Sequence, residues 1–67
     1  MTGLIVRYIA ADSSGCQKYY MRIFTVAEQD AAEFREMRGR AYELAVRDIK
    51  RSEASQGRRY WKTEKVV

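Results

Sequence analysis

The chain has 67 residues, with 13 Lys and Arg against 9 Asp and Glu, which gives a formal net charge of +4. A domain this short buries only about 60% of the surface that its unfolded chain exposes, so it commonly depends on disulfides, a metal or a partner chain. One cysteine, Cys16, and no histidine exclude an intrachain disulfide and the usual zinc ligand sets. We therefore expect a single domain, residues 1–67, without cofactors and with a partner protein or a second copy.

Residues 4–11 and 17–25 are predicted to form two strands of an antiparallel hairpin. Both segments, LIVRYIAA and QKYYMRIFT, are rich in β-branched and aromatic residues, which favour strands. The DSSG between them supplies an Asp that can bond its own backbone and a Gly that accepts positive φ. Both are typical of a tight turn.

A helix is predicted from about residue 26 to about residue 53. Thr25 and Glu28 have the spacing of a capping box. Acids are frequent in the early turns and bases in the last ones, as the helix dipole favours. One side pairs acids with bases at i,i+3 and i,i+4 (Glu36, Arg40, Glu43 and Arg47), and the other is an apolar stripe. That stripe comprises Ala27, Ala31, Phe34, Ala41, Ala45 and Ile49, flanked by Met37 and Leu44.

Arg38 and Gly39 fall in the middle of this predicted helix. Glycine costs about 1 kcal/mol relative to alanine in a helix interior. Gly39 therefore marks a bend, a close backbone contact or a break into two shorter helices. Arg38 falls near the middle of the apolar stripe, where its stem lies on the core with its charge outward, or its charge meets a carboxylate of a partner or second copy.

The last predicted element is a strand over residues 58–66, which follows the polar segment SEASQG and its helix-terminating glycine. The predicted fold is α+β, a small antiparallel sheet in the order β-β-α-β with one long amphipathic helix packed on one face. About 27 helical residues span about 40 Å, whereas a strand of eight spans about 26 Å. We expect the helix to overhang the sheet, where a homodimer contact through the helix is possible.

The positive charge is concentrated on the predicted strands. Residues 26–53 hold seven acids and six bases, a net charge of −1, and the rest of the chain holds seven bases and two acids, a net charge of +5. Together these give the total of +4. Any partner attracted by this charge is expected to approach the sheet.

Strand side chains alternate between the two faces of a sheet, so Tyr19, Met21 and Ile23 share one face of the second strand. If the helix covers that face, the other face is basic and aromatic, and one of Tyr60 and Trp61 belongs to the core. The candidate partner-binding residues are Arg7, Lys18, Tyr20, Arg22, Arg58, Arg59, Tyr60, Trp61 and Lys62.

Three interpretations of this predicted surface are open. It is an ordinary solvated sheet face, a protein-binding face in which Tyr, Trp and Arg act as anchors, or a face that stacks bases and neutralises phosphates. The sheet-type RNA-binding signature K/R-G-F/Y-G/A-F-V-x-F/Y is missing, and no helix-turn-helix spacing stands out.

The sequence shows no catalytic signature. Most acids fall on the predicted solvated side of the helix, and Cys16 lacks a base with an orienting partner. The glycines match neither the phosphate loop nor the dinucleotide fingerprint. The longest apolar run, Leu4-Ile5-Val6, is far short of a membrane span, and no signal-peptide pattern is present. We expect a non-enzymatic, soluble, cytoplasmic protein.

Four segments define the layout: the strand LIVRYIAA, the strand Lys18–Thr25, the helix start TVAEQDAAEF and the closing strand RRYWK. In size and order of elements, this layout resembles the small anti-CRISPR inhibitors among phage and mobile-element proteins. The resemblance implies inhibition by occupancy, in which a compact protein binds a nucleic-acid-handling complex in the host cytoplasm and blocks its engagement of nucleic acid. The alternative is a small nucleic-acid-binding or regulatory protein that contacts phosphates and bases directly with the same face.

Overall fold

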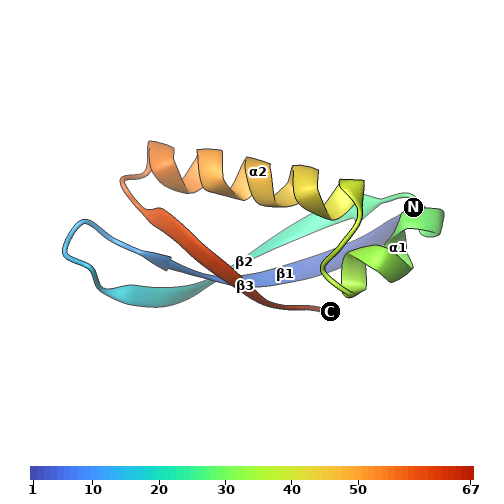
Figure 1. Ribbon diagram of the computed structural model, residues 1–67, viewed down its shortest axis with the longest axis horizontal. Coiled ribbons are helices and arrows are strands. Elements are labelled where there is room, and N and C mark those ends of the chain that lie inside the picture. Colours follow the sequence, from blue (N-terminus) through green and yellow to red (C-terminus); the bar gives the residue numbers. More distant parts are fainter.

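The computed structural model describes residues 1–67 and has a three-stranded antiparallel sheet, a long helix along one face of it and a short helix at the end of the sheet near the N-terminus (Figure 1). The elements are β1 (Thr2–Ala11), β2 (Gln17–Val26), α1 (Glu28–Arg35), α2 (Arg40–Ser55) and β3 (Arg59–Val66). The predicted α+β class is confirmed. The order of elements is β-β-α-α-β, because the predicted single helix is two helices.

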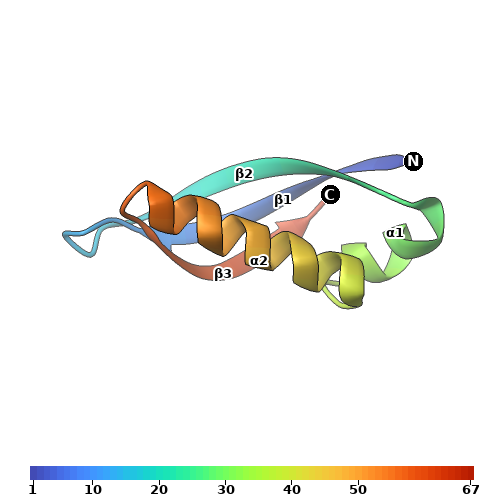
Figure 2. The same cartoon turned by 90° about the horizontal axis from the view of Figure 1, so that it is seen from above.

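The sheet has the order β2-β1-β3, so β1 is the central strand (Figure 2). The pairing of β1 with β2 is uninterrupted from Thr2 opposite Val26 to Ala11 opposite Gln17, whereas the pairing of β1 with β3 shifts register twice. In the hairpin turn the Asp12 carboxylate accepts hydrogen bonds from the backbone N–H groups of Ser14 and Cys16, at 2.9 and 3.0 Å. The predicted hairpin and its turn are therefore confirmed.

The core lies between the sheet and the helices and is built on the even-numbered residues of β1. Phe34 of α1 is fully buried, and its ring packs edge-on against Tyr42 of α2 with the centroids 5.7 Å apart. The even-numbered residues of β1 from Leu4 to Ala10 thus form the sheet side of the core. The buried cluster comprises Leu4, Val6, Tyr8, Ala10, Val26, Ala31, Phe34, Ala45 and Ile49.

The predicted helix is broken between Arg35 and Arg40. Gly39 has a φ of 90°, which L side chains rarely adopt. It is the N-cap of α2 and breaks the helix, which was one of the open alternatives. Arg38 lies in the connection and pairs with Glu36 at 2.5 Å, so it neither lies on the core nor awaits a partner's carboxylate.

Three further helix predictions are wrong. Thr25 belongs to β2, and Ala27 is the N-cap of α1 without any side-chain hydrogen bond, so no capping box forms. The five ion pairs of the structure include none between Glu36, Arg40, Glu43 and Arg47. With 16 residues, α2 is about 24 Å long, shorter than a ten-residue strand of about 33 Å, so it does not overhang the sheet.

Glu53, in the last turn of α2, is the only charged residue in the buried set, with 2% of its surface exposed. Its carboxylate accepts a hydrogen bond from the Tyr8 hydroxyl of β1 and one from Nε of Arg58, which precedes β3. The Arg58 backbone N–H also donates to the Glu53 carbonyl, at 2.9 Å. One side chain thus joins the helix layer, the central strand and the start of β3.

The surroundings of Glu53 keep it ionised. Burial alone would raise the pKa of this carboxyl, but hydrogen bonds from Arg58 and Tyr8, together with the positive charges of Arg58 and Arg22, hold it below its usual 4.5. Burial, reinforced by the hydrogen bond to Glu53, raises the pKa of the Tyr8 phenol far above 10.0. Tyr8 therefore stays the donor and Glu53 the acceptor throughout the physiological range.

We expect Glu53→Ala to lower the free energy of unfolding by about 3–5 kcal/mol, because it leaves Arg58 and Tyr8 without their buried acceptor. Glu43→Ala is the matched control, since Glu43 is an exposed acid on the same helix. Urea denaturation followed by circular dichroism measures both.

The pH dependence gives the same prediction a second readout. A carboxyl whose pKa is depressed by folding stabilises the folded state above its unfolded pKa, and this contribution disappears as the pH falls through the lower folded value. The wild type should therefore lose stability below about pH 4.5, and Glu53→Gln should lose less over that range. Equal losses in the two proteins would contradict a structural role for the ionised carboxylate.

Gly39→Ala should destabilise the protein by about 1–3 kcal/mol, the usual cost of a residue held in a sparsely populated backbone region. Its φ is 90°, and an added Cβ would lie 3.3 Å from the Cβ of Glu33. Gly3→Ala is the control, because nothing lies within 4 Å of its added Cβ. Thermal denaturation of the two variants checks the difference, and equal midpoints would show that the connection relaxes without cost.

Candidate functional site: the open face of the sheet

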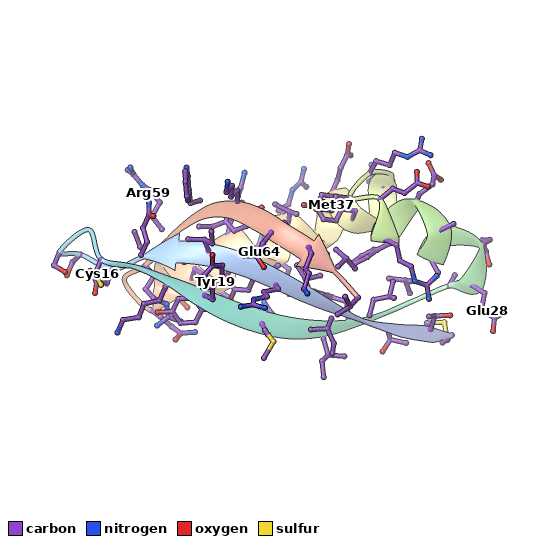
Figure 3. The ribbon with its side chains drawn as sticks, turned by 90° about the horizontal axis from the view of Figure 1, so that it is seen from below. Cys16, Tyr19, Glu28, Met37, Arg59 and Glu64 are labelled. Atoms are coloured by element: carbon purple, nitrogen blue, oxygen red, sulfur yellow. The ribbon has the colours of Figure 1, made fainter.

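The sheet face turned away from the helices carries no other layer, and we call it the open face (Figure 3). Because paired residues of antiparallel strands share a face, the register places the odd-numbered residues of β1 and β2 there. In β3, Arg59, Lys62 and Lys65 pair with odd-numbered β1 residues. The register places Ile5, Arg7, Ile9, Tyr19, Met21, Ile23, Arg59, Lys62 and Lys65 on the open face. Glu64 joins them through its ion pair with Arg7, and Trp61 through its contact with Lys62.

Large apolar side chains are exposed on this face. Ile23 is 72% exposed, Met21 68%, Tyr19 56% and Trp61 55%. Three of these four come from β2, which is one edge strand of the sheet, and Trp61 comes from β3, which is the other edge strand. Folding alone gains nothing from apolar surface left in water, and clustered exposure of this kind is typical of interaction surfaces.

Arg7 links the three strands across the middle of the open face. Its guanidinium carbon lies 4.7 Å from the ring centroid of Tyr19 on β2, and its Nε lies 3.4 Å from a carboxylate oxygen of Glu64 on β3. The neighbouring Glu64 carboxylate raises the pKa of the Tyr19 phenol. Figure 3 shows Tyr19 and Glu64 close together over the middle of the sheet. This bridge holds Tyr19 in place with its ring available to solvent.

The β3 side of the open face is basic. The Lys62 ammonium lies 4.7 Å from the ring centroid of Trp61, a cation–π contact that orients the indole. With Arg7, Arg59, Lys62 and Lys65 against Glu64, the face has four cations and one acid, a net charge of +3. The face thus joins an apolar half over β2 to a cationic half over β3.

The predicted grouping of the candidate residues on one face is wrong. Four of them, Arg7, Arg59, Trp61 and Lys62, lie on the open face, where a binding role stays a prediction. The others lie on the side of the helices, and they are Lys18, Tyr20, Arg22, Arg58 and Tyr60.

Packing against Tyr8 explains why the second group turns inward. The Tyr20 ring stacks on the Tyr8 ring with centroids 5.9 Å apart, and the Arg58 guanidinium lies 4.4 Å from the Tyr20 centroid. Arg22 bonds Asp48 of α2 at 2.9 Å. Of the two aromatic residues left open by the sequence, Tyr60 packs against the core and Trp61 is exposed.

Sequence reasoning assigned Tyr19, Met21 and Ile23 to the covered face. The signal that could have corrected this was the hairpin itself. Ala11 pairs with Gln17 across the turn, so residues of equal parity share a face. Arg7 is the one charged residue of β1, and its parity marks the odd-numbered side of both strands as the open one.

A shallow apolar groove also lies on the helix side, between the end of β2 and the two helices. It has a volume of about 290 Å³, and its lining includes Phe24, Val26, Leu44 and Asp48. Leu44 is 46% exposed. The groove holds one acid beside each of its helices, Asp30 and Asp48, and so lacks the basic charge of the open face.

No protein family model, no curated protein and no solved structure matches this chain. Neither helix combines the length and the apolar character that crossing a membrane requires. No cluster of three or more His, Cys, Asp or Glu side chains could hold a metal ion. The candidate function therefore rests on the geometry and charge of the open face.

Arg22→Glu and Lys62→Glu reverse the same charge on opposite faces of the sheet and should affect stability differently. Arg22→Glu places an acid beside Asp48 and near Glu53, so we expect a loss of about 1 kcal/mol or more, which for a domain of this size is about 4–8 °C in thermal midpoint. Lys62→Glu should leave the midpoint nearly unchanged, because Lys62 is exposed and forms no ion pair. Differential scanning calorimetry measures both, and equal midpoints would contradict the assignment of faces.

Proposed function

We propose that the protein is a non-enzymatic, cytoplasmic binding protein that docks its open face on an acidic and partly apolar surface of a partner protein. The observation that carries the proposal is the composition of that face. Exposed Tyr19, Met21, Ile23 and Trp61 lie beside a net charge of +3. Tyr, Trp and Arg dominate the binding energy of protein interfaces, and Met is enriched in them.

The arrangement favours a protein partner over nucleic acid. The aliphatic side chains of Met21 and Ile23 offer no stacking surface for bases, although they match an apolar interface core. Glu64, at the centre of the face beside Arg7, would repel a phosphate backbone and would accept a hydrogen bond from a protein partner. A face that binds single strands instead combines a continuous cationic groove with several aromatic platforms.

The specific form of this proposal is inhibition of a nucleic-acid-handling complex of a host cell, in the manner of anti-CRISPR proteins. It is supported by the size, the order of elements and the basic open face. Surfaces that bind nucleic acid are basic, so a basic open face would dock on an acidic region beside such a surface. From there the inhibitor would block access of the nucleic acid without any chemistry. The absence of an evident catalytic set in the sequence agrees with such a role.

The test is affinity capture of the partner from a nuclease-treated extract of the native host, with matched variants. Trp61→Ala and Lys62→Glu should each reduce recovery of the captured protein at least tenfold, because they remove an aromatic anchor and reverse a charge on the face. Leu44→Ala and Arg47→Glu make comparable changes at exposed positions of α2 and should leave recovery unchanged. Quantitative mass spectrometry measures recovery.

Direct nucleic-acid binding is the alternative outcome. It predicts a mobility shift of DNA or RNA by the isolated protein at low salt that weakens steeply as salt rises. Such a shift, together with loss of all captured protein after nuclease treatment, would replace the protein-docking proposal.

A further inference from the structure

The two edges of the sheet are built differently. The β3 edge carries two register shifts and several charged residues, among them Arg59, Lys62, Glu64 and Lys65, and bulges and charges are the usual protection of an edge strand against pairing. The β2 edge is an uninterrupted ten-residue strand without a bulge or a proline, and its two charged residues, Lys18 and Arg22, lie on the side of the helices. Its open-face side chains are also the most exposed apolar ones of the sheet.

The backbone groups at the β2 edge are free. The Ile5 N–H and C=O exchange hydrogen bonds with Val67, at 2.7 and 2.9 Å, and therefore point away from β2. Ile23, which pairs with Ile5, must then direct its own N–H and C=O outward, since the two kinds of antiparallel pair alternate. By the same alternation, the outward-pointing groups of β2 include those of Tyr19 and Met21.

No other element of the chain takes up these groups. Apart from the helices and sheet ladders, none of the backbone hydrogen bonds involves residues 17–26. α2 lies over one face of the sheet and α1 lies at its end near the N-terminus, and neither covers the β2 edge (Figures 1 and 2). The edge is therefore a free template of alternating donors and acceptors beside exposed apolar side chains.

We propose that the β2 edge pairs with the β2 edge of a second copy, in antiparallel orientation and centred on Met21. A two-fold axis perpendicular to the sheet then joins two three-stranded sheets into one continuous six-stranded sheet, with all helices on the same side. Met21 lies opposite Met21 of the second copy, Tyr19 lies opposite Ile23, and these outward-pointing residues exchange the backbone hydrogen bonds.

The charges of β2 select this register. Centred on Met21, the pairing sets Lys18 against Phe24 and Arg22 against Tyr20, so that each cation faces an aromatic ring. Centring on Tyr20 would set Lys18 against Arg22, and centring on Arg22 would set that residue against itself. Like charges directly opposite one another destabilise a strand pair. The Met21 register also pairs nearly the whole of β2, with Gln17 opposite Thr25 at each end.

The pairing extends the open face and leaves its basic halves free. Tyr19, Met21 and Ile23 of both copies form one apolar band across the middle of the joined sheet, and the two β3 edges with Trp61 and Lys62 lie at its outer sides. The second copy thereby meets the need for a partner chain that a 67-residue domain commonly has.

Sedimentation equilibrium of the isolated protein tests the proposal, with a dimer expected at micromolar concentration. Met21→Lys should raise the dimer dissociation constant about a hundredfold, because two ammonium groups would face each other at the two-fold axis. An equimolar mixture of Met21→Lys and Met21→Glu should form the heterodimer. Trp61→Lys, at another exposed position on the far edge strand, should leave the dimer intact while it abolishes docking on the open face.

Cysteine cross-linking tests the register itself, in a Cys16→Ser background. In Met21→Cys the two Cα atoms would lie about 5.5 Å apart, within disulfide range, and oxidation should cross-link most of the protein. In Ile23→Cys they would lie about 14 Å apart, and no rapid cross-link should form. A dimer built on α2, which the sequence made possible, would cross-link neither variant.

Three results would overturn the proposal. One is a protein that stays monomeric at every concentration at which it is soluble, and another is a dimer that tolerates Met21→Lys. The third is a dimer in which the Ile23→Cys variant cross-links as fast as the Met21→Cys variant. Far-ultraviolet circular dichroism of each variant distinguishes a loss of association from a loss of folding. The mixture that forms the heterodimer restores pairing without altering the fold of either variant.

Discussion

The contact between the Glu53 carboxylate, the Tyr8 hydroxyl and the Arg58 guanidinium is the interaction on which the rest of the structure depends. It fixes the end of α2 over the central strand and sets where β3 begins. Tyr8 in turn carries the rings of Tyr20 and Tyr60, with centroids 5.9 and 6.0 Å away. An ionised carboxylate at 2% exposure is stable only with such partners, since a buried charge without hydrogen bonds is very costly.

This contact decides which face of the sheet is free. With Tyr8 turned toward α2, the even-numbered residues of β1 and β2 lie on the side of the helices and the odd-numbered residues lie on the open face, where Ile9 alone is buried. Arg22 is thereby committed to Asp48 and the fold, while Tyr19, Met21 and Ile23 are left exposed. The surface available for recognition is consequently a by-product of how the core is packed, and its apolar half lies next to the unprotected edge.

The open face and the β2 edge are distinct surfaces that fit together. The face is a patch of side chains with a net charge of +3, and the edge is a row of backbone groups. Pairing along the edge would place two copies of the face side by side, so that a partner with two acidic patches, or one extended patch, would be held at both. Linked sites of this kind bind more tightly than either alone, because the second contact is intramolecular.

The sequence alone determined the α+β class, the hairpin and its turn, and the concentration of positive charge on the strands, because these depend on local residue preferences and on composition. Tertiary structure decided the rest. Gly39 broke the helix through a φ of 90°, and the helices covered the even-numbered face. Glu53 entered the core because it continues the spacing of Ala45 and Ile49. Its buried charge is compensated by Arg58, close in sequence, and by Tyr8, which is distant in sequence. A local pattern does not specify which of two faces a helix covers, since that choice depends on the summed packing of residues far apart in the chain.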